Sequence, residues 1–339
     1  MKRAKIGDVA RQAGVAVGTV SRVLNGHPSV AAPLRQKVHA AIAALGYERD
    51  TIAQSLRGGR SGLVACAIRD FDIPAFAGFI KEAERLLREA GHTLILSSTG
   101  NRPEVEIGLL HAFARRRVDG VMMTISDEAH PGVLQALAEA PMPVLLIDRD
   151  RIATHDRVTA DHRAGAAQAM RHLLGLGHRR IAMLVGDTNA FPSRSRVQGF
   201  VESFAEAGVA ADHGLLRDRV LSPEDAFRET MALMGLAAPP TAIFVAAMDM
   251  LGGALRALRT LGCEVGRDVA LIAGSDSELA EFHAPPVTAL QWDLPEMGRH
   301  AAAMLLERMQ GTAPEGFRCL KLPTRLVLRE SCLALPTAP

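Results

Sequence analysis

Short aliphatic runs alternate with longer amphipathic stretches from residue 63 to about residue 273, and this alternation restricts the fold more than any other feature of the chain. The short runs predict strands at 63–68, 93–97, 120–124, 144–148, 181–185, 242–246 and 269–273. The longer stretches carry apolar residues at helical spacing, for example at 76–90, 162–176 and 194–207. Strands that alternate with helices form parallel sheets whose two faces the helices cover. The body of the chain is therefore predicted to be α/β.

Sheets of this kind bind ligands beyond the C-terminal ends of their strands. The rule directs attention to the residues at five predicted strand ends, which are Arg69 and Asp70, Asp148 and Arg149, Gly186 and Asp187, Ala247 and Met248, and Ser275 and Asp276. We expect a binding site near some of these positions.

The first 60 residues differ from the rest in charge. Residues 2–60 hold ten Lys and Arg against three Asp and Glu, a balance of +7. The whole chain has 39 basic and 37 acidic residues, so the remaining 279 residues have 29 against 34, a balance of −5. A basic segment on a mildly acidic body indicates a protein that contacts DNA with one end and something else with the other.

Three short helices are predicted in this basic segment, because apolar residues share one helical face in each of three stretches. The faces consist of Ile6, Val9, Ala10 and Ala13, then Val15, Val20, Val23 and Leu24, then Leu34, Val38, Ile42 and Leu45, with a tight turn at Gly14. Together they can close a small core. The second helix then presents outward Val17, Gly18, Thr19, Ser21 and Arg22. Short or hydrogen-bonding side chains around one long cation suit the major groove of DNA. The alternative is the solvated face of an ordinary three-helix bundle.

Several classes of function lack support in the sequence. No apolar run reaches the roughly 20 residues of a membrane helix, and Asp8 and Arg11 stand where a signal peptide needs apolar residues, so we expect a cytoplasmic protein. The four cysteines are far apart and form no C-x-x-C pair, so we expect neither a metal site nor a disulfide framework. Phosphate-loop, dinucleotide-binding and nucleophile-elbow motifs are missing, so we expect no enzyme activity and no cofactor.

Residues 6–25 resemble the helix-turn-helix of the lac repressor family. The matching letters are D-V-A at 8–10, A-G-V at 13–15 and T-V-S-R-V-L-N at 19–25. The resemblance implies DNA contacts from the second helix and its surroundings, at Val17, Gly18, Thr19, Ser21, Arg22, Asn25 and Tyr47. Ala16 and Ala31 depart from the pattern, because the family prefers a helix-capping Ser at both positions. Each Ala should weaken its helix by about 1 kcal/mol.

Residues 50–60 resemble the hinge helix of the same family. Asp50 or Thr51 can cap a short helix, and Gly58 and Gly59 end it. A helix of about seven residues does not persist alone in water, and in the family it forms only when two copies meet in the minor groove. The resemblance implies that Ala53 contacts DNA and that Leu56 inserts between base steps and kinks the duplex. The alternative is a flexible linker with one exposed leucine.

The resemblance continues through the body. R-V-D-G-V at 117–121, G-H-R-R-I-A at 177–182, R-V-Q-G-F at 196–200 and P-P-V-T at 285–288 are phrases typical of the family, so the resemblance covers about residues 5–330. It implies a small all-α helix-turn-helix head at 1–49, a hinge at 50–60, an α/β periplasmic-binding-protein-like body of two doubly wound lobes at 61–330, and a tail at 331–339. The body would bind the effector between its lobes and form the dimer, and the chain would cross between the lobes near residues 160, 290 and 322.

Motif positions assign seven candidate contacts with a small-molecule effector, which are Phe76, Asp148, Arg149, Arg196, Leu221, Asp276 and Trp292. Alternatives stay open for four of them. Arg196 and Asp276 are also compatible with surface or helix-capping charges, and Asp148 stands beside an arginine that can pair with another loop. Trp292, the only tryptophan, fits the core as well as it fits a wall that stacks on the ligand.

The expected effector is a sugar, a sugar acid or a sugar phosphate. Many sugar-binding members carry Asn-Asp after the strand that here ends at Ala246, whereas this chain reads Ala-Ala-Met-Asp at 246–249. The missing amide weakens the case for a neutral hexose, unless Asp249 takes its place. Arg149, Arg194 and Arg196 favour an acidic sugar, because a guanidinium binds carboxylate and phosphate groups as a fork.

These features predict a sequence-specific DNA-binding regulator of transcription, most simply a repressor, that binds an inverted-repeat operator and responds to the effector. The tail lacks the apolar heptads of a coiled-coil tetramer, so a homodimer is expected. Two other interpretations are a solute-binding protein, which would need a signal sequence in place of the basic head, and an α/β enzyme. A gel shift with promoter DNA separates the three.

Overall fold

The computed structural model describes residues 4–24, 27–47, 61–71, 76–247 and 249–335. It divides into two compact units, Met1–Ser61 and Gly62–Pro339, which we call the head and the body. Asn25, Ala53, Leu56 and the whole segment 48–60 lie outside the described residues. The expectations about the hinge helix and these DNA contacts therefore stay predictions.

Three helices form the head, and they are α1 (Ile6–Ala13), α2 (Val17–Leu24) and α3 (Ala32–Leu45). Gly14 ends α1 with φ 67°, a left-handed conformation that glycine adopts without strain, and the chain then turns directly into α2. Val9, Val20 and Val38 are completely buried at the centre, with residues of all three predicted faces around them.

One residue of the predicted core lies elsewhere. Leu34 is 38% exposed, because it belongs to the first turn of α3, and Val30 just before that helix packs into the core instead.

Ala31 stands at the N-cap of α3 with an extended backbone. Its methyl side chain has no hydrogen-bond acceptor, so it provides no capping hydrogen bond. The start of α3 therefore lacks a side-chain cap, although the guanidinium of Arg35 donates to the carbonyl oxygen of Val30 at 3.4 Å.

The first lobe of the body is built on a parallel sheet with strand order β11-β5-β4-β3-β1-β2. Its strands are β1 (Leu63–Ile68), β2 (Thr93–Ser98), β3 (Gly120–Met123), β4 (Val144–Ile147), β5 (Asp156–Ala160) and β11 (Cys319–Leu322). Helices α5 (Phe76–Glu89) and α13 (Leu294–Gln310) cover one face of the sheet, and α6 (Pro103–Arg115) and α7 (Pro131–Ala138) cover the other.

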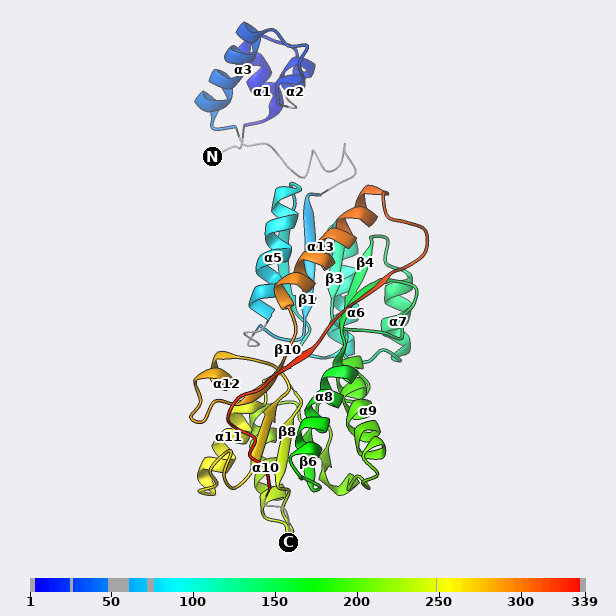
Figure 1. Ribbon diagram of the computed structural model, residues 1–339. Coiled ribbons are helices and arrows are strands. Elements are labelled where there is room, and N and C mark those ends of the chain that lie inside the picture. Colours follow the sequence, from blue (N-terminus) through cyan, green and yellow to red (C-terminus); the bar gives the residue numbers. More distant parts are fainter. Residues whose placement is uncertain (1–3, 25–26, 48–60, 72–75, 248, 336–339) are drawn as a thin grey trace. The chain divides into compact units, whose positions relative to one another are not determined.

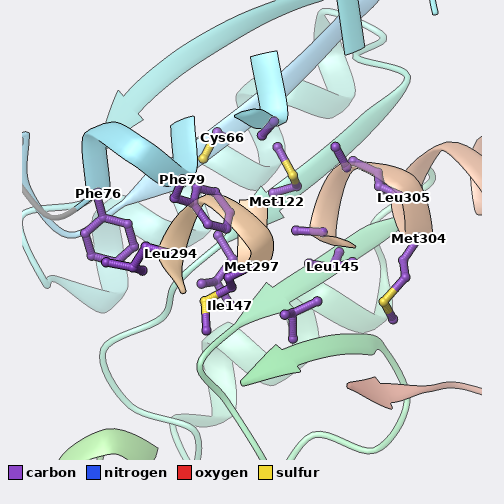
Figure 2. Close-up of a cluster of buried hydrophobic side chains, with 14 of the residues drawn as sticks. Cys66, Phe76, Phe79, Met122, Leu145, Ile147, Leu294, Met297, Met304 and Leu305 are labelled. Atoms are coloured by element: carbon purple, nitrogen blue, oxygen red, sulfur yellow. The ribbon is translucent and has the colours of Figure 1, made fainter. Parts of the chain in front are cut away.

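The core beneath α5 and α13 is densely packed. Figure 2 shows Phe79 and Met297 of these helices against Met122, Leu145 and Ile147 of the sheet. The two helices approach closely at Gly298, where a Cβ would lie 2.2 Å from the carbonyl oxygen of Phe79. A side chain at this position would push α13 away from α5.

The second lobe has strand order β12-β10-β9-β8-β6-β7, and all its strands run parallel except β12. The strands are β6 (Ile181–Leu184), β7 (Leu216–Arg217), β8 (Ala242–Val245), β9 (Ala270–Ala273), β10 (Thr288–Gln291) and β12 (Arg325–Val327). Helices α8 (His162–Gly175) and α9 (Phe191–Glu206) pack on one face, and α10 (Pro223–Met234), α11 (Leu251–Thr260) and α12 (Glu278–Phe282) pack on the other. The predicted α/β class, with helices on both faces of each sheet, is confirmed.

The chain crosses between the lobes three times (Figure 1). It leaves the first sheet after β5 and begins α8, returns after β10 into α13, and leaves again from β11 into β12. Because the other strands of the first sheet run parallel to β5, their C-terminal ends face the second lobe. None of the helices in the described ranges has the length and apolar character to span a bilayer.

We predict that Ala31→Ser stabilises the head. A serine hydroxyl at this N-cap can accept a hydrogen bond from the amide of Leu34, which otherwise has only the carbonyl oxygen of residue 31 at 3.1 Å, and such a cap is worth about 1 kcal/mol. Amide hydrogen exchange in α3 of the full-length protein should slow about fivefold. The control is Ala43→Ser, at an exposed position inside α3 where a hydroxyl has no capping role. Equal exchange rates in the two variants would contradict the prediction.

Candidate functional site

Helix α2 of the head presents the residues predicted to contact DNA. Val17, Gly18 and Arg22 are exposed, while Thr19 and Ser21 are half-buried. Val20 and Val23 of the same helix point into the core, so the exposed face is fixed in orientation. In the described part of the chain no ion pair engages Arg22, which leaves this cation free to interact with a partner.

Tyr47 has a different environment. It follows α3, is half-buried, and packs against the core of the head, with its amide donating to the carbonyl oxygen of Ile42 at 3.0 Å. The structure thus gives Tyr47 a packing role, and its contact with DNA stays a prediction.

A cavity of about 120 Å³ lies between the two lobes of the body. The first lobe contributes residues that follow its strands, among them Arg69 after β1, Thr124 after β3, and Asp148 and Arg149 after β4. The second lobe contributes His162 from α8 and Ser193 and Arg196 from α9. The cavity therefore lies at strand ends, where parallel sheets of this kind bind their ligands.

Five of the seven candidate effector contacts line this cavity, namely Phe76, Asp148, Arg149, Arg196 and Leu221. Asp276 is not among the lining residues. Its carboxylate accepts hydrogen bonds from Arg329 at 2.7 and 3.0 Å and from Gln291 at 3.2 Å. Trp292 is not among them either, and it lies buried against His162 and Arg196. The roles of all seven residues in effector binding stay predictions.

The carboxylate of Asp148 links the end of β4 to the first crossing. Asp148 has φ 51°, and its Oδ1 accepts hydrogen bonds from the Ala160 amide at 2.9 Å and from Nε2 of His162 at 3.0 Å. Burial alone would raise the pKa of the Asp148 carboxyl, but its interactions with His162, the Ala160 amide and Arg149 hold that pKa below its ordinary value. Asp148 is therefore ionised at neutral pH.

The buried arginines of the cavity differ in how far they are engaged. Arg149 donates to the carbonyl oxygens of Ile125 and Ile147. Burial lowers the pKa of Arg149, and the nearby carboxylate of Glu128 opposes only part of this effect. Arg196 donates to the carbonyl oxygen of Gly274 at 3.3 Å, and its Nε has no hydrogen-bond partner among the described residues. Burial lowers the pKa of Arg196 to about 10, so it stays protonated at neutral pH.

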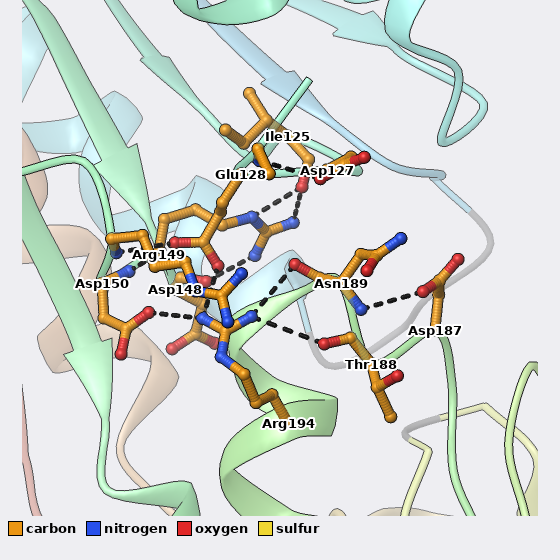
Figure 3. Close-up of polar contacts among 12 residues, drawn as sticks. Ile125, Asp127, Glu128, Asp148, Arg149, Asp150, Asp187, Thr188, Asn189 and Arg194 are labelled. Atoms are coloured by element: carbon orange, nitrogen blue, oxygen red, sulfur yellow. Dashed lines mark hydrogen bonds and ion pairs between the residues drawn. The ribbon is translucent and has the colours of Figure 1, made fainter. Parts of the chain in front are cut away.

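Ion pairs join the two lobes beside the cavity. Nη2 of Arg194 in α9 lies 2.6 Å from Oδ1 of Asp150 and 3.2 Å from Oε1 of Glu128, both in the first lobe (Figure 3). The side chain of Glu128 is completely buried, and its Oε2 accepts the amides of Asp150 and Arg151. A second pair joins Arg69 to Asp249 at 2.9 Å. These contacts hold the lobes together at the margin of the cavity.

Four polar lining residues were absent from the sequence candidates, namely Asn101, Thr124, His162 and Ser193. No motif marks His162. The sequence feature that could have identified it as a site residue is its position directly after the first predicted crossing between the lobes. Within the described part of the chain, no three His, Cys, Asp or Glu side chains gather as a metal site.

Comparisons with known proteins place both units in characterised families. Residues 5–50 match the model for bacterial regulatory proteins of the lacI family, and residues 170–332 match the periplasmic binding protein-like domain. The HTH-type transcriptional regulator DegA of Bacillus subtilis is 32% identical over 335 residues, which are 97% of this chain and 98% of DegA. The HTH-type transcriptional repressor PurR of Haemophilus influenzae is 28% identical over 97% of this chain and 98% of PurR.

Solved structures agree with the sequence matches. The lac repressor dimer bound to operator and an anti-inducer aligns with a TM-score of 0.87 at 28% identity, covering 98% of this chain and 100% of that one. The complex of the transcriptional regulator CelR with cellobiose aligns with a TM-score of 0.73 at 31% identity, covering 97% and 100%.

We predict that Arg194→Ala loosens the contact between the lobes. It removes both ion pairs of Arg194 and leaves the buried Glu128 without its cation, which should cost about 2 kcal/mol. Trp292, the only tryptophan, is buried at the second crossing and reports the change through quenching of its fluorescence by acrylamide, which should increase.

Arg163→Ala is the matched control, because it removes a 2.6 Å ion pair with Glu202 that lies within the second lobe. It should leave the quenching of Trp292 unchanged. Identical quenching constants in the two variants would show that the Arg194 pairs do not hold the lobes together.

Proposed function

The chain belongs to the lacI family of bacterial regulatory proteins, and from this premise we propose that it represses transcription by binding an inverted-repeat operator as a homodimer and that a small metabolite in the inter-lobe cavity controls this binding. The observation that carries the proposal is the combination of an exposed, uncommitted face on α2 with a body that holds a polar cavity at its strand ends. Two heads related by a two-fold axis require two half-sites in inverted orientation.

An uncharged sugar is the effector that we favour. The crystallised relative CelR is bound to cellobiose, which supports a sugar. The expectation of an acidic sugar rested on Arg149, Arg194 and Arg196. Of these, Arg149 is bound to backbone carbonyls and Arg194 to two carboxylates, so neither guanidinium is available to bind a carboxylate or phosphate of the ligand with two hydrogen bonds. An anionic ligand would also approach the ionised carboxylate of Asp148.

Control of DNA binding would act through the hinge at 50–60, which lies outside the described residues. In this proposal the body has two arrangements, and one of them holds the two hinge segments of the dimer close enough to fold on DNA. The effector shifts the balance between the arrangements only by its difference in affinity for them. The Arg194–Glu128 and Arg69–Asp249 contacts are those that a change in lobe closure would break or make.

We predict that Arg22→Ala strongly weakens operator recognition while the fold survives. An arginine that contacts a guanine edge contributes about 1–3 kcal/mol, so specific affinity should fall roughly 10- to 100-fold. The operator is first obtained by selection from randomised inverted repeats, and binding is then measured by gel shift on operator and random DNA. Lys37→Ala is the control, because it removes a head cation from α3 and not from α2. Unchanged specific binding by Arg22→Ala with a native circular-dichroism spectrum would exclude the assigned role.

We predict that the full-length protein is a dimer in solution. A single hinge segment is too short to fold alone, so it needs a second copy beside it, and the similar lac repressor was solved as a dimer on its operator. Light scattering should give twice the chain mass of 36.2 kDa. A stable tetramer, or a monomer bound to a single half-site, would contradict this assembly.

A further inference from the structure

His162 lines the inter-lobe cavity and is almost completely buried. It is the first residue of α8, directly after the first crossing, and its side chain is 1% exposed. The imidazole lies between Phe191 and Trp292, with ring centroids at 5.7 and 5.2 Å and both rings steeply inclined to it. These aromatic contacts fix the plane of the imidazole ring.

The proton of the neutral imidazole is located by Asp148. Nε2 of His162 lies 3.0 Å from Oδ1 of Asp148, and an ionised carboxylate can only accept, so Nε2 carries the hydrogen. Burial lowers the pKa of His162, Arg196 lowers it further, and the opposing effects of Asp148 and Asp161 do not outweigh them. At neutral pH, Nδ1 therefore presents a lone pair.

This lone pair has no partner. Nδ1 of His162 is buried and receives no hydrogen bond from any described residue. The other strongly buried histidine, His178, uses both nitrogens, with Thr241 Oγ1 at 2.9 Å and the carbonyl oxygen of Leu333 at 3.1 Å. Burying an acceptor without a donor is unfavourable, so the site gains when a ligand supplies the donor.

An unpaired donor belongs to the same cavity wall. Arg196 is 3% exposed, lies over the ring of Trp292 at 5.6 Å, and has a free Nε–H among the described residues. The wall thus combines a buried acceptor with a buried donor. A hydroxyl group satisfies both, because it donates and accepts. A carboxylate or phosphate only accepts, so it would leave Nδ1 unpaired.

We infer that His162 and Arg196 together bind a hydroxyl group of the effector, with Nδ1 of His162 accepting its hydrogen and the guanidinium of Arg196 donating to its oxygen. His162 is then a residue that determines specificity, and Asp148 is the residue that positions it. The inference rests on the proposed function and adds to it the kind of chemical group that the cavity recognises.

The test compares uncharged sugars with their anionic counterparts on the full-length protein. The probes are cellobiose and glucose against cellobionate, glucuronate and glucose 6-phosphate, and the readout is the ligand-dependent rise of the unfolding midpoint. At least one uncharged sugar should raise the midpoint of the wild type, and its anionic counterpart should raise it less, because its charge would approach the ionised carboxylate of Asp148. His162→Phe keeps a ring but loses the acceptor, and it should weaken the response about tenfold. His162→Gln restores an acceptor and should recover part of it.

His172→Gln is the control, since His172 lies half-buried on the same helix and does not line the cavity. Histidine 15N resonances give a second readout, in which Nδ1 of His162 is unprotonated in the free protein and shifts when the sugar binds. The inference is overturned by a wild-type response to anionic sugars alone, by no response to any uncharged sugar, by a normal response of His162→Phe, or by a protonated Nδ1. Gel shifts of the wild type on the selected operator test the proposed function separately, because loss of operator binding would leave these sugar results intact.

Discussion

The arrangement of the inter-lobe cavity depends on one buried carboxylate. Asp148 directly follows β4 in a left-handed backbone conformation that is unfavourable for a residue with a side chain. Its hydrogen bonds to the Ala160 amide and to His162 compensate, and both partners lie where the chain first passes from one lobe to the other. A side chain of the first lobe thereby fixes the first residue of α8 in the second. The ring of His162 in turn contacts Trp292 at the second crossing, so two of the three crossings share one network.

The charges around the cavity follow a consistent pattern. Buried Arg149 is stabilised by backbone carbonyls, whereas Arg194 and Arg69, which are partly exposed, pair with carboxylates of the opposite lobe. Both of these cations therefore form an ion pair across the lobes in this arrangement. A closed pair of lobes then buries little uncompensated charge, which keeps the cost of closure low. Specificity rests on the few groups left without partners.

Local patterns in the sequence predicted more of the fold than of the binding site. Val9, Val20 and Val38 were found from helical spacing, and all seven predicted strands exist, because burial of one face imposes a period on the sequence. The strands β5, β10 and β11 were expected only as crossings between the lobes, through the family resemblance. The strands β7 and β12 were missed, since they are short and carry Arg217 and Arg325. Phe76, Arg196 and Leu221, which line the cavity, were identified as candidates only by their resemblance to family motifs. The pairing of Asp276 with Arg329 and of Asp148 with His162 could not be predicted, because such contacts between distant residues leave no periodic trace.

The three crossings also dictate the order in which the molecule can be completed during synthesis. The head closes its core once residue 45 has left the ribosome. The first lobe must wait much longer, because α13 and β11 reach it from residues 294–322. Until then, Met122, Leu145 and Val158 on this face of the sheet lack α13, the second of the two helices that cover it, although the second lobe is almost fully synthesised. Such apolar surface on a nascent chain favours aggregation and chaperone binding. The two lobes are therefore finished almost together, and neither lobe corresponds to a continuous stretch of the gene.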